Sequence, residues 1–244
     1  MLKQVGKSRW LELLNRLGRH ELGTLLLVLV AAAATWGFVE LADEVAEGET
    51  ATLDQTLLLA LRNPADPSDP LGPTWLEELA RDLTALGGTG VLTLITLTVV
   101  GFLLLQRKTH AALLLAVAVG GGMILGTVLK LGFERPRPDL VPHAVHVYTY
   151  SFPSGHAMLA AVTYLTLGAL LARVQPRLRI KAYLLLIAVL LTVLVGISRV
   201  YLGVHWPTDV LAGWTVGAAW AVLCWLIARW LQRRGKVERD INGE

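Results

Sequence analysis

Three short segments of the chain combine residue types that can bind and transfer a tetrahedral oxyanion. They span residues 130–138, 153–156 and 198–209, and they supply basic side chains, two imidazoles, a hydroxyl, a glycine and a carboxylate. Phosphoryl transfer needs cations around the equatorial oxygens, an in-line nucleophile and an acid for the leaving oxygen. The three segments together contain each of these groups, so they indicate phosphoryl transfer through a nitrogen nucleophile.

The oxyanion site is expected to combine cations with a helix N-terminus. The basic side chains suited to holding phosphoryl oxygens are Lys130, Arg137 and Arg199. Ser154 precedes an apolar run and is expected to cap its helix, and Gly155 lets the backbone approach an anion there. Arg135, in the same Arg-Pro-Arg-Pro run as Arg137, is interpreted as a flank, with a role at the site as the alternative.

The two histidines in these segments have different surroundings. His205 and Asp209 are four residues apart, with Pro207 suited to the first turn of a helix. This spacing lets the carboxylate hold one ring nitrogen and leaves the other free to attack, which favours His205 as the nucleophile. His156 follows the glycine turn without an orienting acid, so it is better placed to move a proton.

The composition is that of a chain embedded in a membrane. Of its 244 residues, 54% are hydrophobic and 17% are charged, whereas a soluble domain is nearer one quarter charged. Mean hydropathy is +0.55. No basic run is interleaved with aromatic residues, so no nucleic-acid partner is expected. Apolar runs without strict alternation predict membrane-spanning helices rather than barrel strands. The six expected spans are residues 22–41, 86–106, 111–131, 155–172, 182–202 and 210–231.

Loop charge predicts how these spans are oriented. The N-terminal segment, residues 107–108, the loop 173–181 and the C-terminal residues are basic and fall on one side of a six-span arrangement. The positive-inside rule makes that side cytoplasmic. The loop 43–82, on the opposite side, is acidic. Both termini are therefore expected in the cytoplasm of a bacterial inner or plasma membrane, and all three motifs on the periplasmic or extracellular side.

The spans also predict the domain organisation. Residues 1–21 are expected as a basic amphipathic segment on the cytoplasmic membrane surface, residues 22–231 as a single all-α integral membrane bundle, and residues 232–244 as a cytoplasmic tail. Within the first outer loop, leucines at 53, 57, 58 and 61 form an apolar stripe, and residues 74–77 resemble a capping box. We expect two short interfacial helices there, which either shape lipid entry or cover the top of the bundle.

The three segments, in this order and separated by apolar spans, resemble the signature of the type 2 phosphatidic acid phosphatase family, whose catalytic core is shared with vanadium haloperoxidases. The resemblance covers about residues 130–209. It implies that His205 attacks phosphorus to form a phosphohistidine, that Asp209 orients it, and that His156 protonates the leaving oxygen. It implies no metal or cofactor, and the sequence has no convincing metal-ligand cluster. The residues that it assigns to the phosphoryl oxygens are Lys130, Arg137, Ser154, Gly155 and Arg199.

Several functions use such a site. The favoured function is hydrolysis of a lipid phosphate or diphosphate at the non-cytoplasmic leaflet, with phosphatidic acid, phosphatidylglycerol phosphate and undecaprenyl diphosphate as candidate substrates. A lipid phosphotransferase would use the same chemistry with another acceptor, and a haloperoxidase would bind vanadate in a soluble scaffold. An anion transporter would place its charges near the membrane midplane, whereas these charges gather at one end. The choice among the lipids and the oligomeric state stay open.

Overall fold

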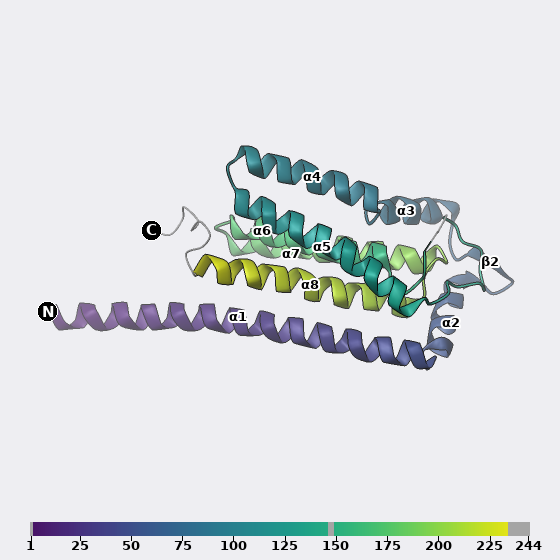
Figure 1. The fold of residues 1–244 in the computed structure, drawn as a ribbon, viewed down its shortest axis with the longest axis horizontal. Helices are drawn as coiled ribbons and strands as arrows, with labels where there is room; N and C mark the ends of the chain where they lie inside the picture. Colours follow the sequence, from purple (N-terminus) through teal and green to yellow (C-terminus); the bar gives the residue numbers. More distant parts are fainter. Residues whose placement is uncertain (1, 146–148, 234–244) are drawn as a thin grey trace.

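Helices make up most of the chain in a computed structural model that describes residues 2–145 and 149–233, with side chains described from residue 22 onward. The long helices lie side by side along one axis, and the short helix α2 (Ala51–Leu59) runs across one end of them (Figure 1). The elements in chain order are α1 (Leu2–Glu47), α2 (Ala51–Leu59), β1 (Arg62–Asn63), β2 (Asp66–Pro70), α3 (Thr74–Ala85), α4 (Thr89–Leu105), α5 (Thr109–Phe133), α6 (Gly155–Arg173), α7 (Leu178–Tyr201) and α8 (Pro207–Arg233).

The expected all-α bundle with six spans is confirmed. Within the described residues, five helices are individually long and apolar enough to cross a membrane, and the bent pair α3 and α4 gives a sixth when it is counted as one span. The axes of that pair differ by 48°. Helix α4 begins at Thr89, a few residues after the expected start of the second span near residue 86. Gly87 and Gly88 make turn hydrogen bonds to Thr84 and Ala85 at the bend, which ends α3.

Helix α1 runs alongside α8 (Figure 1). The start of α1 and the end of α8 lie at the same end of the bundle. The segment predicted to lie on the membrane surface, residues 2–21, continues in the same helix as the first span. The opposite end of α1 is held by an aromatic cluster. Phe38 stacks on Phe152, and Phe133 meets Phe152 edge-on with ring centroids 4.9 Å apart. The predicted tail lies outside the described residues beyond Arg233.

Helix α6 occupies the middle of the bundle and packs against α5, α7 and α8. Its approach to α8 depends on two glycines. A Cβ atom on Gly213 would lie 2.7 Å from the carbonyl oxygen of Ser154, and one on Gly217 would lie 2.6 Å from that of Met158. Any larger side chain would push the two helices apart. This close contact fixes the start of α6, which carries His156, against the start of α8.

The first outer loop contains the two expected short helices, α2 and α3, with a small antiparallel hairpin of β1 and β2 between them. One detail of the prediction is wrong. The capping box does not form, because α3 begins at Thr74 itself, with Pro73 as its N-cap and no side-chain cap. The apolar stripe is divided between two environments, since Leu58 and Leu61 pack in the bundle. Leu53 and Leu57 are exposed, whereas Asp54 and Leu58 are buried.

Candidate active site

All the candidate site residues lie at the end of the bundle that carries α2 and the hairpin (Figure 1). Lys130 lies in the last turn of α5. The C-cap of this helix is Glu134, which has a left-handed backbone conformation. The chain then passes through Arg137 and returns to the start of α6. The short loop 202–206, between α7 and α8, carries His205. Four helix ends, those of α5, α6, α7 and α8, and the two loops that join them therefore meet at this end of the bundle.

The His205 ring is buried and held from both sides. Its Nδ1 atom lies 3.3 Å from Oδ2 of Asp209, and its Nε2 atom lies 3.1 Å from Nη1 of Arg137. A guanidinium can only donate hydrogen bonds, so Nε2 must be the accepting, unprotonated nitrogen. The proton is then on Nδ1, directed at Asp209. The predicted pairing at a spacing of four residues is present, and it leaves a lone pair on Nε2.

The Asp209 carboxylate has donors at both oxygens. Its Oδ2 atom accepts hydrogen bonds from the Trp206 backbone N–H at 2.9 Å and from the hydroxyl of Ser151. Its Oδ1 atom accepts from Nη1 of Arg135 at 2.6 Å. These contacts stabilise the ionised form and hold the carboxylate in place for His205.

Burial is the main reason that the pKa of His205 lies well below its usual value of 6.5, and the positive charges of Arg199, Arg137 and Lys130 lower it further. Burial also lowers the pKa of Arg137, although the negative charge of Asp209 opposes this effect. The imidazole is consequently neutral at physiological pH, which is the form that can attack an electrophile.

The start of α6 has the geometry expected of an anion site. Ser154 is its N-cap, as predicted, and its side chain accepts a hydrogen bond from the backbone N–H of Ala157 at 3.5 Å. A Cβ atom on Gly155 would lie 3.5 Å from Cε of Lys130, so the lysine crosses directly over this glycine. His156 follows, and a Cβ atom on Gly88 would lie 4.0 Å from its Nε2 atom. The bend between α3 and α4 therefore forms the wall behind His156.

The arginines of the site differ in how many of their donors are already used. Arg137 donates to the carbonyl oxygens of Thr149 at 2.7 Å and Val204 at 2.6 Å, besides its contact with His205. Arg199 is only 3% exposed, and its Nη1 atom donates to Oγ1 of Thr84 at 2.8 Å. The Nε atom of Arg199 is buried without a hydrogen-bond partner. A buried donor of this kind is costly unless a ligand accepts from it.

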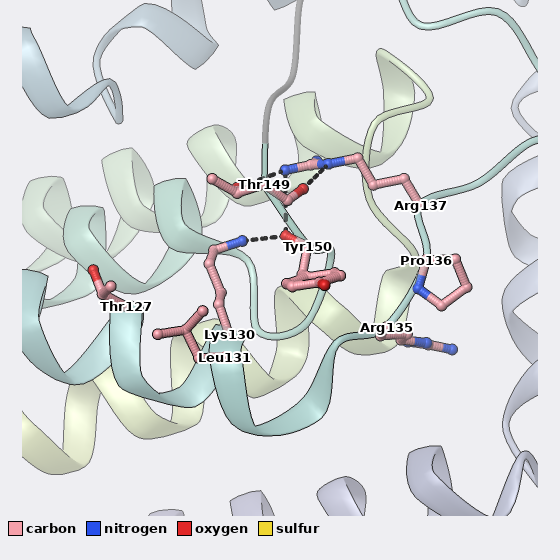
Figure 2. Close-up of a pocket in the computed structure, with 8 residues that line it drawn as sticks. All are labelled: Thr127, Lys130, Leu131, Arg135, Pro136, Arg137, Thr149 and Tyr150. Atoms are coloured by element: carbon pink, nitrogen blue, oxygen red, sulfur yellow. Dashed lines mark hydrogen bonds between the residues drawn. The ribbon is translucent and has the colours of Figure 1, made fainter.

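A pocket of about 570 Å³ is lined by Lys130, Arg135 and Arg137 among other residues. Figure 2 shows the amine of Lys130 and the guanidinium of Arg137 pointing toward the backbone of Thr149 and Tyr150. A second pocket of about 260 Å³ lies further along α5, and Thr127 lines both pockets. The side chains of the second pocket are Met123, Ile124, Thr127 and Val128. The two pockets share Thr127, and both lie along α5, where Met123, Ile124 and Val128 are apolar.

Sequence reasoning missed two residues and underestimated a third. Arg135, interpreted as a flank, contacts Asp209 directly. Ser151 contacts Asp209 and lies 3.3 Å from Nδ1 of His205, yet nothing in its sequence context distinguishes it from other loop serines. Asp54 pairs with Arg135 at 2.7 Å from a loop far away in the sequence. Within the described ranges, no group of three or more His, Cys, Asp or Glu is arranged to hold a metal ion.

The sequence of the chain is similar to those of known membrane phosphatases. The model of the PAP2 superfamily matches residues 111–233. A phosphatidylglycerophosphatase B from Bacillus subtilis is 42% identical over 144 residues, which cover 59% of this chain and 70% of that protein. An undecaprenyl-diphosphatase from Sulfolobus acidocaldarius is 31% identical over 121 residues, covering 48% of this chain and 54% of that one.

The fold also matches a solved structure. The crystal structure of a transmembrane PAP2 type phosphatidylglycerolphosphate phosphatase from Bacillus subtilis superposes with a TM-score of 0.71 at 32% identity, covering 86% of this chain and 98% of that chain. The chain therefore belongs to the PAP2 superfamily. It is an integral membrane phosphatase, as the three motifs and the apolar spans predicted.

Proposed function

We propose that the chain hydrolyses a lipid phosphate or diphosphate through a phosphohistidine on His205. The observation that supports this proposal best is that the contacts of the His205 imidazole fix its orientation and its tautomer. Asp209 lies at Nδ1, Arg137 lies at Nε2, and burial keeps the ring neutral. Such a ring is oriented and deprotonated at the nitrogen that faces the cations, as an attacking nucleophile must be.

The reaction that we propose has two steps. In the first, Nε2 of His205 forms a bond to phosphorus while the bond from phosphorus to the lipid oxygen breaks, and His156 gives that oxygen a proton. In the second, water attacks phosphorus, His156 takes up a proton from the water, and the bond to His205 breaks to release phosphate. Asp209 stabilises the positive charge that develops on the His205 ring.

Oriented donors would stabilise the phosphoryl oxygens during both steps. Arg199 has a buried Nε atom without a partner, which suits an anion better than any other feature of the site. Lys130 crosses Gly155, so both lie beside the N-terminus of α6 that Ser154 caps. Arg137 would be a further donor to the phosphoryl oxygens. To bind one, it would give up a hydrogen bond to a backbone carbonyl, such as that of Thr149.

The proposed substrate class follows from the two pockets beside α5. A lipid whose phosphate reaches Lys130 and Arg137 can lay its hydrocarbon chain past Thr127 onto Met123 and Val128. The names of the relatives support phosphatidylglycerol phosphate and undecaprenyl diphosphate as the first substrates to test. We also propose that the site faces the non-cytoplasmic leaflet and that both termini are cytoplasmic, since the loops at the other end of the bundle are basic.

The direct test of the activity measures phosphate release by the purified protein in detergent. The panel contains phosphatidic acid, phosphatidylglycerol phosphate, undecaprenyl diphosphate and a water-soluble phosphate ester, each with a strong chelator present. We expect release from at least one lipid in chelator, and inhibition by vanadate, because the cations of the site are side chains. Activity that is lost in chelator and restored by magnesium would contradict the metal-independent mechanism.

The roles of the two histidines can be distinguished by comparing how each alanine variant acts on substrates with different leaving groups. His205→Ala should abolish both turnover and the acid-labile phosphoenzyme trapped by rapid quench. His156→Ala should lose about 100- to 10,000-fold on lipid phosphates, the usual contribution of general acid catalysis, but much less on a nitrophenyl phosphate. His110, at the start of α5 and at the opposite end of the bundle, provides the matched control His110→Ala. A phosphoenzyme in His205→Ala and none in His156→Ala would reverse the assignment.

A further inference from the structure

The position of His205 depends on the ends of two helices. It lies in the loop 202–206, which joins the C-terminus of α7 to the N-terminus of α8. Helix ends carry partial charges, positive at the N-terminus and negative at the C-terminus, and expose backbone groups that no helical partner satisfies. The side chains that form hydrogen bonds with the free backbone groups at these two helix ends therefore fix the position of the loop.

Arg62, from β1 of the first outer loop, satisfies the end of α7. In the last turn of that helix, the carbonyl oxygens of Ser198, Arg199 and Val200 accept backbone N–H groups. The carbonyl oxygen of Tyr201 accepts instead from Nη2 of Arg62 at 2.9 Å. Arg62 is only 3% exposed, so its positive charge lies at the negative end of α7.

Asp54, from α2 of the same outer loop, satisfies the start of α8. Its Oδ1 atom accepts the backbone N–H of Thr208 at 3.0 Å, and its Oδ2 atom accepts the Thr208 hydroxyl at 2.6 Å. Asp54 is 1% exposed. A carboxylate at a helix N-terminus complements the positive end of the helix and caps its free N–H groups. The charge is therefore opposite to that of Arg62, and each matches the helix end it contacts.

Arg135 connects Asp54 to the catalytic pair. Its Nη2 atom lies 2.7 Å from Oδ2 of Asp54, and its Nη1 atom lies 2.6 Å from Oδ1 of Asp209. One partly buried guanidinium thus bridges the two carboxylates, and it also donates to the Thr208 hydroxyl at 2.9 Å. Arg135 therefore links Asp54 to Asp209, which contacts the His205 ring.

The outer loop is itself anchored where these contacts are made. Leu58, one turn after Asp54 in α2, is fully buried against Val200 and Val210. Close to the hairpin, the carbonyl oxygen of Leu71 accepts the Tyr201 hydroxyl at 2.9 Å. Tyr201 therefore holds the outer loop twice, through its hydroxyl and through the carbonyl bound to Arg62.

We infer that the first outer loop clamps both helix ends that flank His205, with Arg62 and Asp54 as positioning residues for the catalytic imidazole. This inference rests on the proposed function and extends it, because neither residue touches the phosphoryl group. The loop would then do more than cover the bundle, since it holds the lone pair of Nε2 on the line of attack. Misplacement of a nucleophile lowers the rate of the chemical step and leaves substrate binding largely unchanged.

The test measures kcat and KM for phosphate release separately in four variants. Asp54→Asn removes the charge but keeps a hydrogen-bond acceptor, Arg62→Met removes the donor, and Arg62→Lys restores one. Asp66→Asn, at an exposed aspartate in the same loop that bonds only to Ser68, is the matched control. We expect kcat and the rate of phosphoenzyme formation to fall about 10- to 100-fold in Asp54→Asn and Arg62→Met, with KM within about twofold. Arg62→Lys should recover part of the loss, and Asp66→Asn should match the wild type.

A double variant distinguishes transmission through Arg135 from general loosening. If Asp54 acts through Arg135, adding Asp54→Asn to Arg135→Gln should cost much less than it does in the wild type. Should Asp54→Asn fail to fold, Thr208→Val and Thr208→Ser replace it, since only the serine keeps the hydroxyl bonded to Asp54. Wild-type kcat in folded Asp54→Asn and Arg62→Met would overturn the inference. A wild type that releases no phosphate from any lipid would overturn the proposed function instead.

Discussion

Arg137 lies at hydrogen-bond distance from the nitrogen of His205 that is proposed to attack phosphorus, with Nη1 and Nε2 3.1 Å apart. The contact fixes the tautomer, because the guanidinium has only donors and must leave the Nε2 lone pair to accept. It also occupies that lone pair. We propose that a phosphoryl group that binds Arg137 frees the lone pair for attack.

The first prediction concerns the shape of Arg137 rather than its charge. Arg137→Lys keeps a cation but not the fork that donates to Thr149, Val204 and His205 at once. We expect kcat/KM for a lipid phosphate to fall roughly 100-fold or more, as when an oriented donor to the reacting oxygens is lost. Arg81→Lys, at an exposed arginine paired with Glu77, is the control and should not change it. Retention of half the activity in Arg137→Lys would mean that charge alone suffices.

The second prediction concerns acid stability. The pKa of His205 is lowered in the folded state by burial and by neighbouring cations, whereas in the unfolded chain it returns to about 6.5. Below that pH the unfolded state binds a proton that the folded state excludes, so the free energy of unfolding decreases as pH falls. The thermal midpoint in detergent should drop between about pH 7 and about pH 5, and drop less in His205→Asn. Equal slopes for the two proteins would show that His205 does not contribute.

The third prediction concerns Ser151. Its hydroxyl donates to Asp209 and, with its proton used there, can accept from Nδ1 of His205, so it helps hold the ring plane. Ser151→Ala removes one of several contacts to the carboxylate and should lower kcat about 10-fold with little change in KM. Ser68→Ala, at an exposed loop serine, controls for loss of a hydroxyl. A KM effect without a kcat effect would place Ser151 on the substrate path instead.

Much of the fold and part of the site follow from local sequence patterns. Apolar runs set the spans because each must cross the same thickness of hydrocarbon. A serine before an apolar run predicted the cap of α6, and the spacing of His205 and Asp209 predicted a pair that lies 3.3 Å apart. These features depend on residues within one turn of a helix, where sequence separation determines spatial separation.

The contacts that position the pair could not be predicted in this way. Asp54 reaches Thr208 across 154 positions, and Ser151 reaches Asp209 across 58. The sequence shows an apolar stripe in α2 but gives no reason to bury Asp54, which the structure buries because Arg135 and Thr208 supply partners for its charge. A buried carboxylate is stable only when such partners exist. Periodicity contains no information about them.

The last prediction tests orientation. On a Cys224→Ala background, a cysteine at Ala65, on the exposed tip between β1 and β2, should react with a membrane-impermeant maleimide in intact cells. A cysteine at Gln106, the exposed C-cap at the other end of α4, should react only after the membrane is opened. The physical reason is the positive-inside rule, since Arg107 and Lys108 follow Gln106 directly, whereas the outer loop is acidic. Ala65 and Gln106 are both uncharged, so neither substitution alters the charges that set the orientation. Labelling of Gln106→Cys but not Ala65→Cys in intact cells would invert the topology and place the site on the cytoplasmic leaflet.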